Sequence, residues 1–360
     1  MRNNELRVRE LSYSAPLIGN IRQILTGLDG FDSMAREIIQ NADDAGAKSI
    51  RFDITDDALI VANDAKFLNC GLNADECPWA TDGNPELGKR KACDFHAISK
   101  VGSGNKYNQP GLIGRFGIGF VSVYQLTDQP IIRSGDVELR LDPLSERNQV
   151  RTIETGEGSE IQINWALDDR SPIREALSAS AFSLENRGRL QNDLVTTAEE
   201  CLLFLRNLDS IEILRNGNRV SFVQKSAADE NHLELFFERK NRREKWYVIH
   251  LDAEVAARPL KEKFVAIERL DRQTTVQIAF RLDNHEERAG RLFAYLPTEQ
   301  DSPIPCHINA DFFPEQTRKA LVLSGEQHER HWNEMLLGYA AQEIAARLES
   351  LRDVLGLTGL

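Results

Sequence analysis

The stretch EIIQNADDA, residues 37–45, constrains the fold more than any other part of the sequence. Apolar residues recur at steps of three and four from Phe31 to Ala42, which is the period of an amphipathic helix. Gly46 follows and is a typical residue just past a helix end. The pattern therefore predicts a helix over residues 31–46 with one face in a core.

Three polar residues of this helix lie on one line. A helix turns by about 100° per residue, so Asn41 and Asp44 project within about 40° of Glu37. This seam borders the apolar face instead of opposing it, and two interpretations follow. It is a solvated helix edge, or it is the wall of a nucleotide site, in which Asn41 supplies a neutral oxygen to Mg²⁺ and Glu37 accepts a proton from water.

The composition limits the classes of protein. The chain has 360 residues, 41% of them apolar, which suits about two domains. A net charge of −12 disfavours direct nucleic-acid binding, which requires clustered basic residues. No apolar run is long enough to span a membrane, and the first residues lack the apolar core of a signal peptide. A reduced, cytoplasmic protein is expected from the odd number of cysteines without a CxxC pair.

Cys70, Cys77, Cys93 and His96 fall within one short stretch. These residue types suit zinc, but their spacings are looser than those of common zinc motifs. Buried thiols without a ligand are therefore the favoured interpretation, and a structural zinc site is the alternative.

The first 168 residues are expected to form one mixed α/β domain. It begins with two helices and a β-hairpin, continues through an irregular connection at 65–112, and ends in further strands. A connection of this length inside a compact domain is often a lid. The expected helices are 16–28 and 31–46, and the expected strands are 49–54, 58–64, 130–135, 137–142 and 159–165.

A polar linker is expected at 169–189, followed by a second α/β domain at 190–325 and a helical segment at 326–360. Asn216-Gly217 favours the tight turn of a β-hairpin. The expected helices are 196–208 and 331–351, and the expected strands are 210–222 (a hairpin), 245–252, 274–283 and 290–298.

GRFGIGF at 114–120 is a second candidate for nucleotide contact. Its three glycines let the backbone approach a ligand, and successive N–H groups before a helix bind phosphate. The stretch lacks the GK[ST] of a P-loop and does not open a first βαβ unit.

EIIQNADDAGA and IGRFGIGFVSVYQLTD together resemble the nucleotide-binding boxes of the GHKL ATPases, and the resemblance is closest to sacsin-type and heat-shock-chaperone-like modules. It is sharp over residues 31–165 and weaker to about 340. It implies a Bergerat-type fold, an α/β two-layer sandwich of helices over a mixed sheet, followed by a transducer-like α/β domain.

The resemblance also implies roles for single residues. Glu37 corresponds to the general base, Asn41 to the Mg²⁺ ligand, and Asp44 to a residue near the nucleotide. Asp64 corresponds to the acceptor for the adenine amino group, and Ser159 to a hydroxyl that supports it.

Further implied contacts surround the phosphates. Lys100 corresponds to a lid lysine, and Arg318, or alternatively Lys319, to a cation that a second domain brings to the terminal phosphate. The amides of the glycine-rich loop would cradle the phosphates: Gly114, Arg115, Phe116, Gly117, Ile118, Gly119 and Phe120. The chain departs from the chaperone pattern after Asp64, where Ala65-Lys66-Phe67 replaces the glycines that make room for adenine.

The resemblance implies a Mg²⁺-ATP-dependent conformational switch that hydrolyses ATP, dimerises with ATP and acts on a protein client. Two alternatives remain open. One is a nucleotide sensor with negligible turnover inside a larger assembly. The other is a MutL-like or defence-type DNA-associated ATPase.

Overall fold

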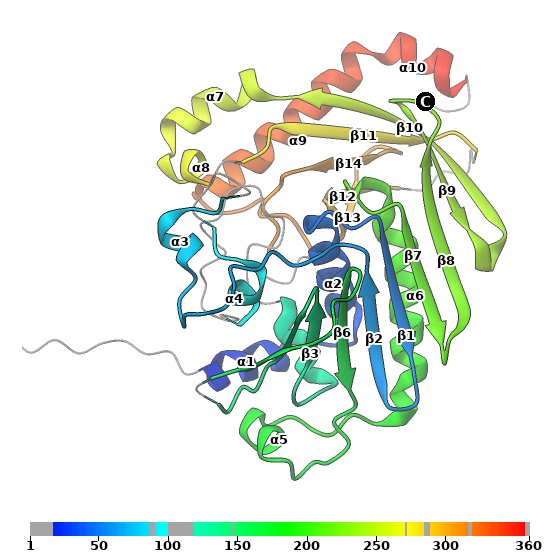
Figure 1. Cartoon of the computed structure of the whole chain (residues 1–360). Helices are drawn as coiled ribbons and strands as arrows, with labels where there is room; N and C mark the ends of the chain where they lie inside the picture. The colour runs from blue at the N-terminus through cyan, green and yellow to red at the C-terminus, as the bar shows by residue number, and fades with distance from the viewer. Residues whose placement is uncertain are drawn as a thin grey trace, which may run out of the picture.

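The computed structural model describes residues 17–85, 91–99, 119–145, 147–270, 272–283, 289–315 and 319–356. Within these ranges the strands form one continuous sheet of 14 strands in the order β13-β12-β14-β11-β10-β9-β8-β7-β1-β2-β6-β3-β4-β5 (Figure 1). The strands of the first half are β1 Ser49–Ile54, β2 Ala58–Asn63, β3 Ile131–Ser134, β4 Val137–Arg140, β5 Gln149–Thr152 and β6 Ser159–Asn164. Those of the second half are β7 Ser210–Arg215, β8 Asn218–Ala227, β9 His232–Phe237, β10 Arg242–Asp252, β11 Thr275–Arg281, β12 Gly290–Ala294, β13 Leu296–Ser302 and β14 His307–Ala310.

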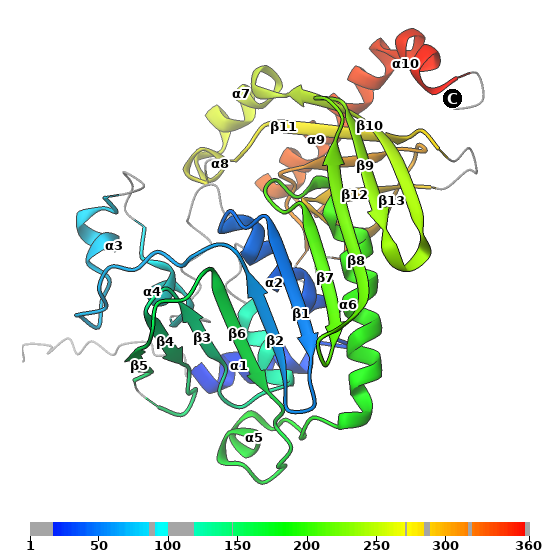
Figure 2. The ribbon, with the colours of Figure 1, turned by 45° about the vertical axis from the view of Figure 1, so that its right-hand side comes forward.

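The helices of the first half are α1 Leu17–Thr26, α2 Asp32–Asp44, α3 Pro78–Asp82, α4 Asp94–Ser99, α5 Pro172–Leu177 and α6 Arg187–Cys201. Those of the second half are α7 Glu254–Lys263, α8 Val265–Arg269, α9 His328–Ala346 and α10 Leu348–Leu355. Short 3₁₀ helices occur at η2 Gly119–Gln125, η3 Leu184–Asn186, η4 Leu202–Phe204 and η5 Glu238–Lys240. Figures 1 and 2 show α2 and α6 beside the strands β1, β2 and β7.

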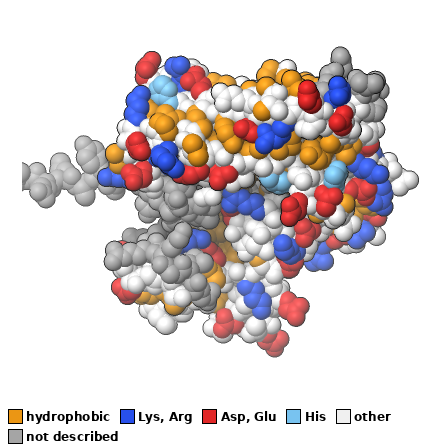
Figure 3. Space-filling view, turned by 90° about the horizontal axis from the view of Figure 1, so that it is seen from above, with side chains coloured by type: hydrophobic (Ala, Val, Ile, Leu, Met, Phe, Trp, Pro, Cys, Tyr) orange, Lys and Arg blue, Asp and Glu red, His pale blue; other side chains and the backbone are white. Residues whose placement is uncertain are grey.

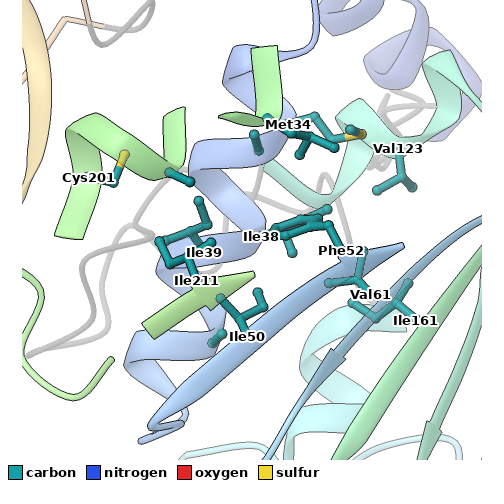
Figure 4. Close-up of a cluster of buried hydrophobic side chains, with 14 of the residues drawn as sticks. Met34, Ile38, Ile39, Ile50, Phe52, Val61, Val123, Ile161, Cys201 and Ile211 are labelled. Carbon is teal, nitrogen blue, oxygen red and sulfur yellow. The ribbon is translucent and has the colours of Figure 1, made fainter. Parts of the chain in front are cut away.

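α2 packs its apolar face on the sheet, as the helical period predicts. Met34, Ile38 and Ile39 are buried and meet Phe52 of β1 and its neighbours in one hydrophobic cluster (Figure 4). The helix ends where the sequence predicts: the backbone N–H of Gly46 donates to Asp43 O, and that of Ala47 donates to Ala42 O. Gly46 has φ +84°, a conformation that glycine adopts without steric cost.

The two halves of the chain share the sheet. β1 pairs with β7 in parallel, with Ser49 opposite Ser210, so the strand after α6 extends the sheet of the first half. The hydrophobic cluster around α2 also includes Trp246 and Phe293 from the second half. The sheet and one hydrophobic core therefore continue from the first half of the chain into the second. The expected domain boundaries at 168 and 190 stay a prediction about which parts fold independently.

Residues 169–189 contain more structure than their polar composition predicts. Ser171 caps α5 by accepting a hydrogen bond from the backbone N–H of Arg174, and Ser183 caps η3 through Glu185 N. The helix expected at 196–208 starts earlier, at Arg187, and passes into η4. The first turns of α6 contain few apolar residues, so the sequence shows only a weak helical period there. Leu190 in these turns is nevertheless fully buried.

A second core lies between α9 and the strands β11 and β14. Trp332 is fully buried, and its indole N–H donates to Asp311 O at 2.9 Å. Asn333 accepts from Phe313 N–H and donates to the carbonyls of Phe313 and Val322, so it fixes both sides of the connection that follows β14. The helix predicted for 331–351 is interrupted at Arg347, between α9 and α10.

Among the described residues, no helix is both long and apolar enough to cross a bilayer. Seen from above, the molecule presents hydrophobic side chains interspersed with charged ones (Figure 3). Among the second-half residues that the structure describes, Val255 of α7 and Val265 of α8 are the most exposed large aliphatic side chains, at 78% and 55%.

Candidate nucleotide site

The polar seam of α2 has the placement that its spacing predicts. Glu37, Asn41 and Asp44 are all half-buried, whereas Ile38 and Ala42 between them are buried. The seam therefore runs along the boundary of the core, where side chains are partly shielded from water. Two carboxylates and a carboxamide on one such line provide hard oxygen ligands and a candidate base.

The end of the glycine-rich stretch lies against the same helix. η2, which begins at Gly119, packs against α1 and α2, and the side chains of Phe120 and Val123 are buried in the core that α2 shares. The residues Gly114, Arg115, Phe116, Gly117 and Ile118 lie outside the described residues, as do Lys100 and Arg318. The described part thus brings the last positions of this stretch against the helix that carries the seam.

Asp43 is a residue that the sequence analysis missed. Its side chain is fully buried, and its carboxylate accepts hydrogen bonds from the backbone N–H groups of Arg206, Asn207 and Leu208 at 2.7–3.1 Å. The Asn207 side chain also donates to Asp43 O at 2.9 Å. Asp43 therefore fastens the end of α2 to the segment that leads into β7. Two consecutive aspartates occur here, and only Asp44 lies on the seam. The position of Asp43 on the apolar side of the helix is the signal that could have indicated a buried, structural carboxylate.

Asp64 has a structural contact at the end of β2. It is exposed, and its Oδ1 accepts the backbone N–H groups of Lys48 and Ser49 at 2.7 and 3.2 Å. Asp64 thereby joins the end of β2 to the start of β1. Its expected contact with adenine stays a prediction.

The neighbouring Asn63 is placed differently. Side chains alternate along a strand, so Asn63 shares a face with Leu59 and Val61, whose side chains are buried under the helices. Its register partner on β6 is Ser159, which is also buried. Asn63 is therefore the polar residue of this strand end that faces the helix layer.

Ser159 supports the turn after β2. Its hydroxyl lies 2.7 Å from Ala65 O, to which it donates, and 2.9 Å from the hydroxyl of Ser134, which also accepts the N–H of Phe67. Gly158 precedes it with φ +71°, and a Cβ there would come within 2.1 Å of Asn63 O. The close approach of β6 to the end of β2 thus requires a glycine at 158.

Lys319 lies near the first turn of α2. Its ammonium pairs with Glu299 at 2.9 Å, and this hydrogen bond raises the pKa of Lys319, with a further contribution from the carboxylate of Asp32. The backbone N–H of Glu315 donates to Ala320 O at 2.8 Å, so the residues on both sides of 316–318 are close together. The described residues that flank this connection thus lie within electrostatic reach of Asp32 at the start of α2, and Arg318 itself lies outside the described residues.

These features form a mixed α/β arrangement of helices beside one sheet, with a half-buried polar seam on α2 at the boundary of the core. Residues 14–172 match the family model of the Sacsin domain. Human Sacsin is 32% identical over 137 residues, which are 36% of this chain and 3% of the human protein. The chain thus corresponds to a small part of that relative's length.

Three solved structures are similar at low sequence identity. The N-terminal domain of a DNA repair protein has a TM-score of 0.45 at 10% identity and covers 92% of this chain and 97% of its own. The ATPase domain of the Aquifex aeolicus mismatch repair endonuclease MutL has a TM-score of 0.37 at 11% identity, covering 89% and 96%. A single-residue variant of the Aquifex aeolicus MutL ATPase domain has a TM-score of 0.31 at 13% identity, covering 64% and 84%.

Proposed function

We propose that the chain binds Mg²⁺-ATP beside α2 and hydrolyses it slowly. The observation that carries this proposal is the half-buried line of Glu37, Asn41 and Asp44 along a helix whose neighbouring face is core. Their partial shielding from water strengthens electrostatic interactions with a metal ion or a phosphate. The match to the Sacsin domain covers all three residues and supports the same conclusion.

Each residue of the seam has a separate task. Asn41 presents a neutral oxygen to Mg²⁺, which avoids adding negative charge beside the phosphates. Glu37, one turn before it, accepts the proton of the attacking water. Asp44 lies at the end of the line, near the nucleotide. The metal neutralises charge on the phosphates, and the chain's own residues orient water and metal around it.

The adenine end lies at the end of β2. The sequence resemblance assigns the contact to Asp64, whereas the strand geometry favours Asn63, which faces the helix layer beside Ser159. The side-chain oxygen of Asn63 accepts the backbone N–H of Ala65 at 3.0 Å, and its second lone pair can accept a hydrogen bond from an amino group. We therefore extend the proposal to Asn63 and assign Asp64 to joining β2 and β1.

The phosphate end is formed by the glycine-rich loop, with Lys100 from the lid and Arg318 from the second half of the chain. Arg is suited to phosphate because its planar group donates two parallel hydrogen bonds. Lys319 is already paired with Glu299, which makes it the weaker candidate. ATP-dependent dimerisation and a protein client extend the proposal by family resemblance.

The decisive experiment compares wild type with Glu37→Ala and Glu37→Gln, and uses Glu185→Ala as the control. Glu185 is an exposed residue of η3. ATP binding by calorimetry should persist in both Glu37 variants, while turnover should fall by roughly 10²–10⁴-fold, the usual worth of a positioned base. Glu185→Ala should match wild type in both measurements.

Two outcomes contradict the proposal. Equal turnover in wild type and both Glu37 variants removes Glu37 as the base. Wild type that binds ATP and never turns it over is instead a nucleotide sensor. Salt-sensitive retention of DNA by the pure chain would support the DNA-associated alternative.

A further inference from the structure

Three thiols and one imidazole converge in the segment that follows β2. Cys70 lies in the connection after the strand, Cys77 precedes the first residue of α3, Cys93 precedes α4, and His96 lies within α4. One ligand atom of each residue lies within 4.8 Å of those of the other three. Cys77, Cys93 and His96 are at most 6% exposed, so the cluster is nearly closed to solvent.

The separations between these atoms are close to those of a tetrahedral metal site. The Sγ atoms of Cys93 and Cys70 are 3.6 Å apart, and His96 Nδ1 lies 3.1 Å from Cys93 Sγ and 3.5 Å from Cys70 Sγ. A zinc ion with Zn–S of about 2.3 Å and Zn–N of about 2.0 Å places its ligand atoms roughly 3.5–3.8 Å apart. The ligand atoms therefore need to move by only tenths of an ångström to about one ångström.

The surroundings orient these ligands. His96 Nε2 lies 3.0 Å from Ala74 O, and a carbonyl only accepts, so Nε2 carries the proton. In the neutral ring Nδ1 then directs its lone pair at the sulfur atoms, which is how outer hydrogen bonds fix a metal-bound histidine. The backbone N–H of Cys93 also donates to Cys77 Sγ at 3.2 Å, which stabilises a thiolate there.

Two other arrangements explain less. Buried thiols that only fill space occur elsewhere in this chain, at Cys201 and Cys306, and neither of these belongs to the four-residue cluster. A disulfide between Cys70 and Cys93 would use two of the sulfurs and leave the directed imidazole and Cys77 without a role. Three sulfurs and one imidazole are soft ligands, which select zinc over the Mg²⁺ of a nucleotide site.

We propose that Cys70, Cys77, Cys93 and His96 bind one structural zinc ion. Four protein ligands complete the tetrahedron and leave no open position for substrate, so the ion has a structural role. It joins the connection after β2 to the start of α4. Other contacts already bring these parts together: Leu68 N–H donates to Asp94 Oδ2 at 2.8 Å, and Asp94 N–H donates to Leu68 O at 3.1 Å.

The zinc ion would therefore fasten the base of the segment 65–112 that the sequence analysis expects to be a lid. Phe67 and Phe95 also meet edge to face at the same place, with ring centroids 5.3 Å apart. Binding of the ion orders this base independently of nucleotide. Because of this, the test of the zinc site uses no nucleotide and no ATPase measurement.

The first measurement is the metal content of the full chain, expressed without added metal salts and purified without a metal-binding tag. Elemental analysis should find about one zinc per chain in wild type and a loss of at least about five-fold in Cys93→Ala and His96→Ala, because each removes one of four ligands. Cys201→Ala and Cys306→Ala are matched controls, because each removes a buried thiol outside the cluster, and both should retain the zinc.

The second measurement is made on wild type and does not depend on how the variants fold. Zinc is removed by a chelator under reducing conditions and Co²⁺ is added. Thiolate-to-cobalt charge transfer and the intense visible bands of tetrahedral cobalt should appear, and one equivalent of zinc should abolish them. Amide hydrogen exchange in residues 68–99 should rise on chelation and fall again on zinc addition.

Three results would overturn the proposal. One is wild type that contains no stoichiometric zinc and gives no cobalt–thiolate spectrum. Another is a Cys70–Cys93 disulfide detected by mass spectrometry of protein purified without reductant. The third is zinc content that Cys306→Ala lowers as much as Cys93→Ala does.

Discussion

Asp43 and Leu208 are joined directly although 165 positions separate them along the chain: the carboxylate Oδ1 of Asp43 accepts the backbone N–H of Leu208 at 2.9 Å. This contact fastens α2, which carries the proposed catalytic residues, to the segment leading into β7. The position of the proposed site on the sheet thus depends on residues of the second half of the chain.

Replacing Asp43 should cost stability. Asp43→Ala removes a buried acceptor of three backbone N–H groups and leaves those groups unpaired, so the free energy of unfolding should fall by about 2–4 kcal/mol. Asp44→Ala is the control on the adjacent, half-buried position and should lower it by less than about 1 kcal/mol. Urea unfolding followed by circular dichroism measures both, and equal losses would contradict the anchoring role.

Substitutions of Asn63 and Asp64 should have different effects on the affinity for nucleotide. Asn63→Ala should weaken ATP and ADP about tenfold each, because adenine is common to both and one hydrogen bond is worth about 1 kcal/mol or slightly more. Asp64→Ala should change both affinities by less than about twofold while lowering stability, since it removes the acceptor for Lys48 and Ser49. Calorimetry that finds the reverse pattern restores the adenine contact to Asp64.

Asn41→Ala should remove the dependence of ATP affinity on magnesium. The side chain lies on the half-buried seam and is not part of the fully buried core, so the fold should persist. Binding measured with Mg²⁺ and with a chelator should differ in wild type and converge in the variant. A variant that binds Mg²⁺-ATP like wild type would show that the seam is only a helix edge.

Arg318→Ala and Lys319→Ala form a matched pair of adjacent cations. Arg318→Ala should lower turnover by about 10-fold or more and leave ADP affinity unchanged, because ADP lacks the terminal phosphate. Lys319→Ala should keep turnover within about twofold, because its ammonium already pairs with Glu299 on the protein surface. If Lys319→Ala lowers turnover more than Arg318→Ala does, Lys319 is the residue that contacts the terminal phosphate.

His307 predicts how stability changes with pH. Burial, followed by the charges of Arg291 and Arg281, lowers its pKa from 6.5 to about 4, and its Nδ1 accepts the N–H of Arg291 at 2.9 Å. Below pH 6.5 the unfolded chain binds a proton that the folded chain does not, so folding loses stability as the pH falls toward 4. At about pH 5 this histidine should contribute a loss of about 2 kcal/mol relative to about pH 7.

The matched variant is His307→Gln, whose side-chain oxygen can still accept the N–H of Arg291. Urea unfolding at about pH 7 and about pH 5 should show a smaller decrease in the variant than in wild type by that amount. An identical decrease in both would mean that other groups cause it.

The local elements that carry the proposed site followed from the sequence. α2 buries the face that its apolar period indicates and ends at Gly46, and β7 and β8 form a hairpin in which Asn216 and Gly217 both have positive φ. These features depend on neighbours a few positions away, so the local sequence is enough to predict the helical period, the turn residues and the helix ends. The two segments proposed to bind nucleotide could be singled out for the same reason, because each is a short continuous segment.

The tertiary structure alone decided which distant residues meet. The parallel pairing of β1 with β7 and the anchoring of α2 by Asp43 depend on segments far apart in sequence, which no local pattern specifies. The same is true of Cys70, Cys77, Cys93 and His96, whose irregular spacing favoured buried thiols over a zinc site. Their ligand atoms converge only because the chain folds back between β2 and α4, since ligand geometry is a property of distances in space and not of spacing along the chain.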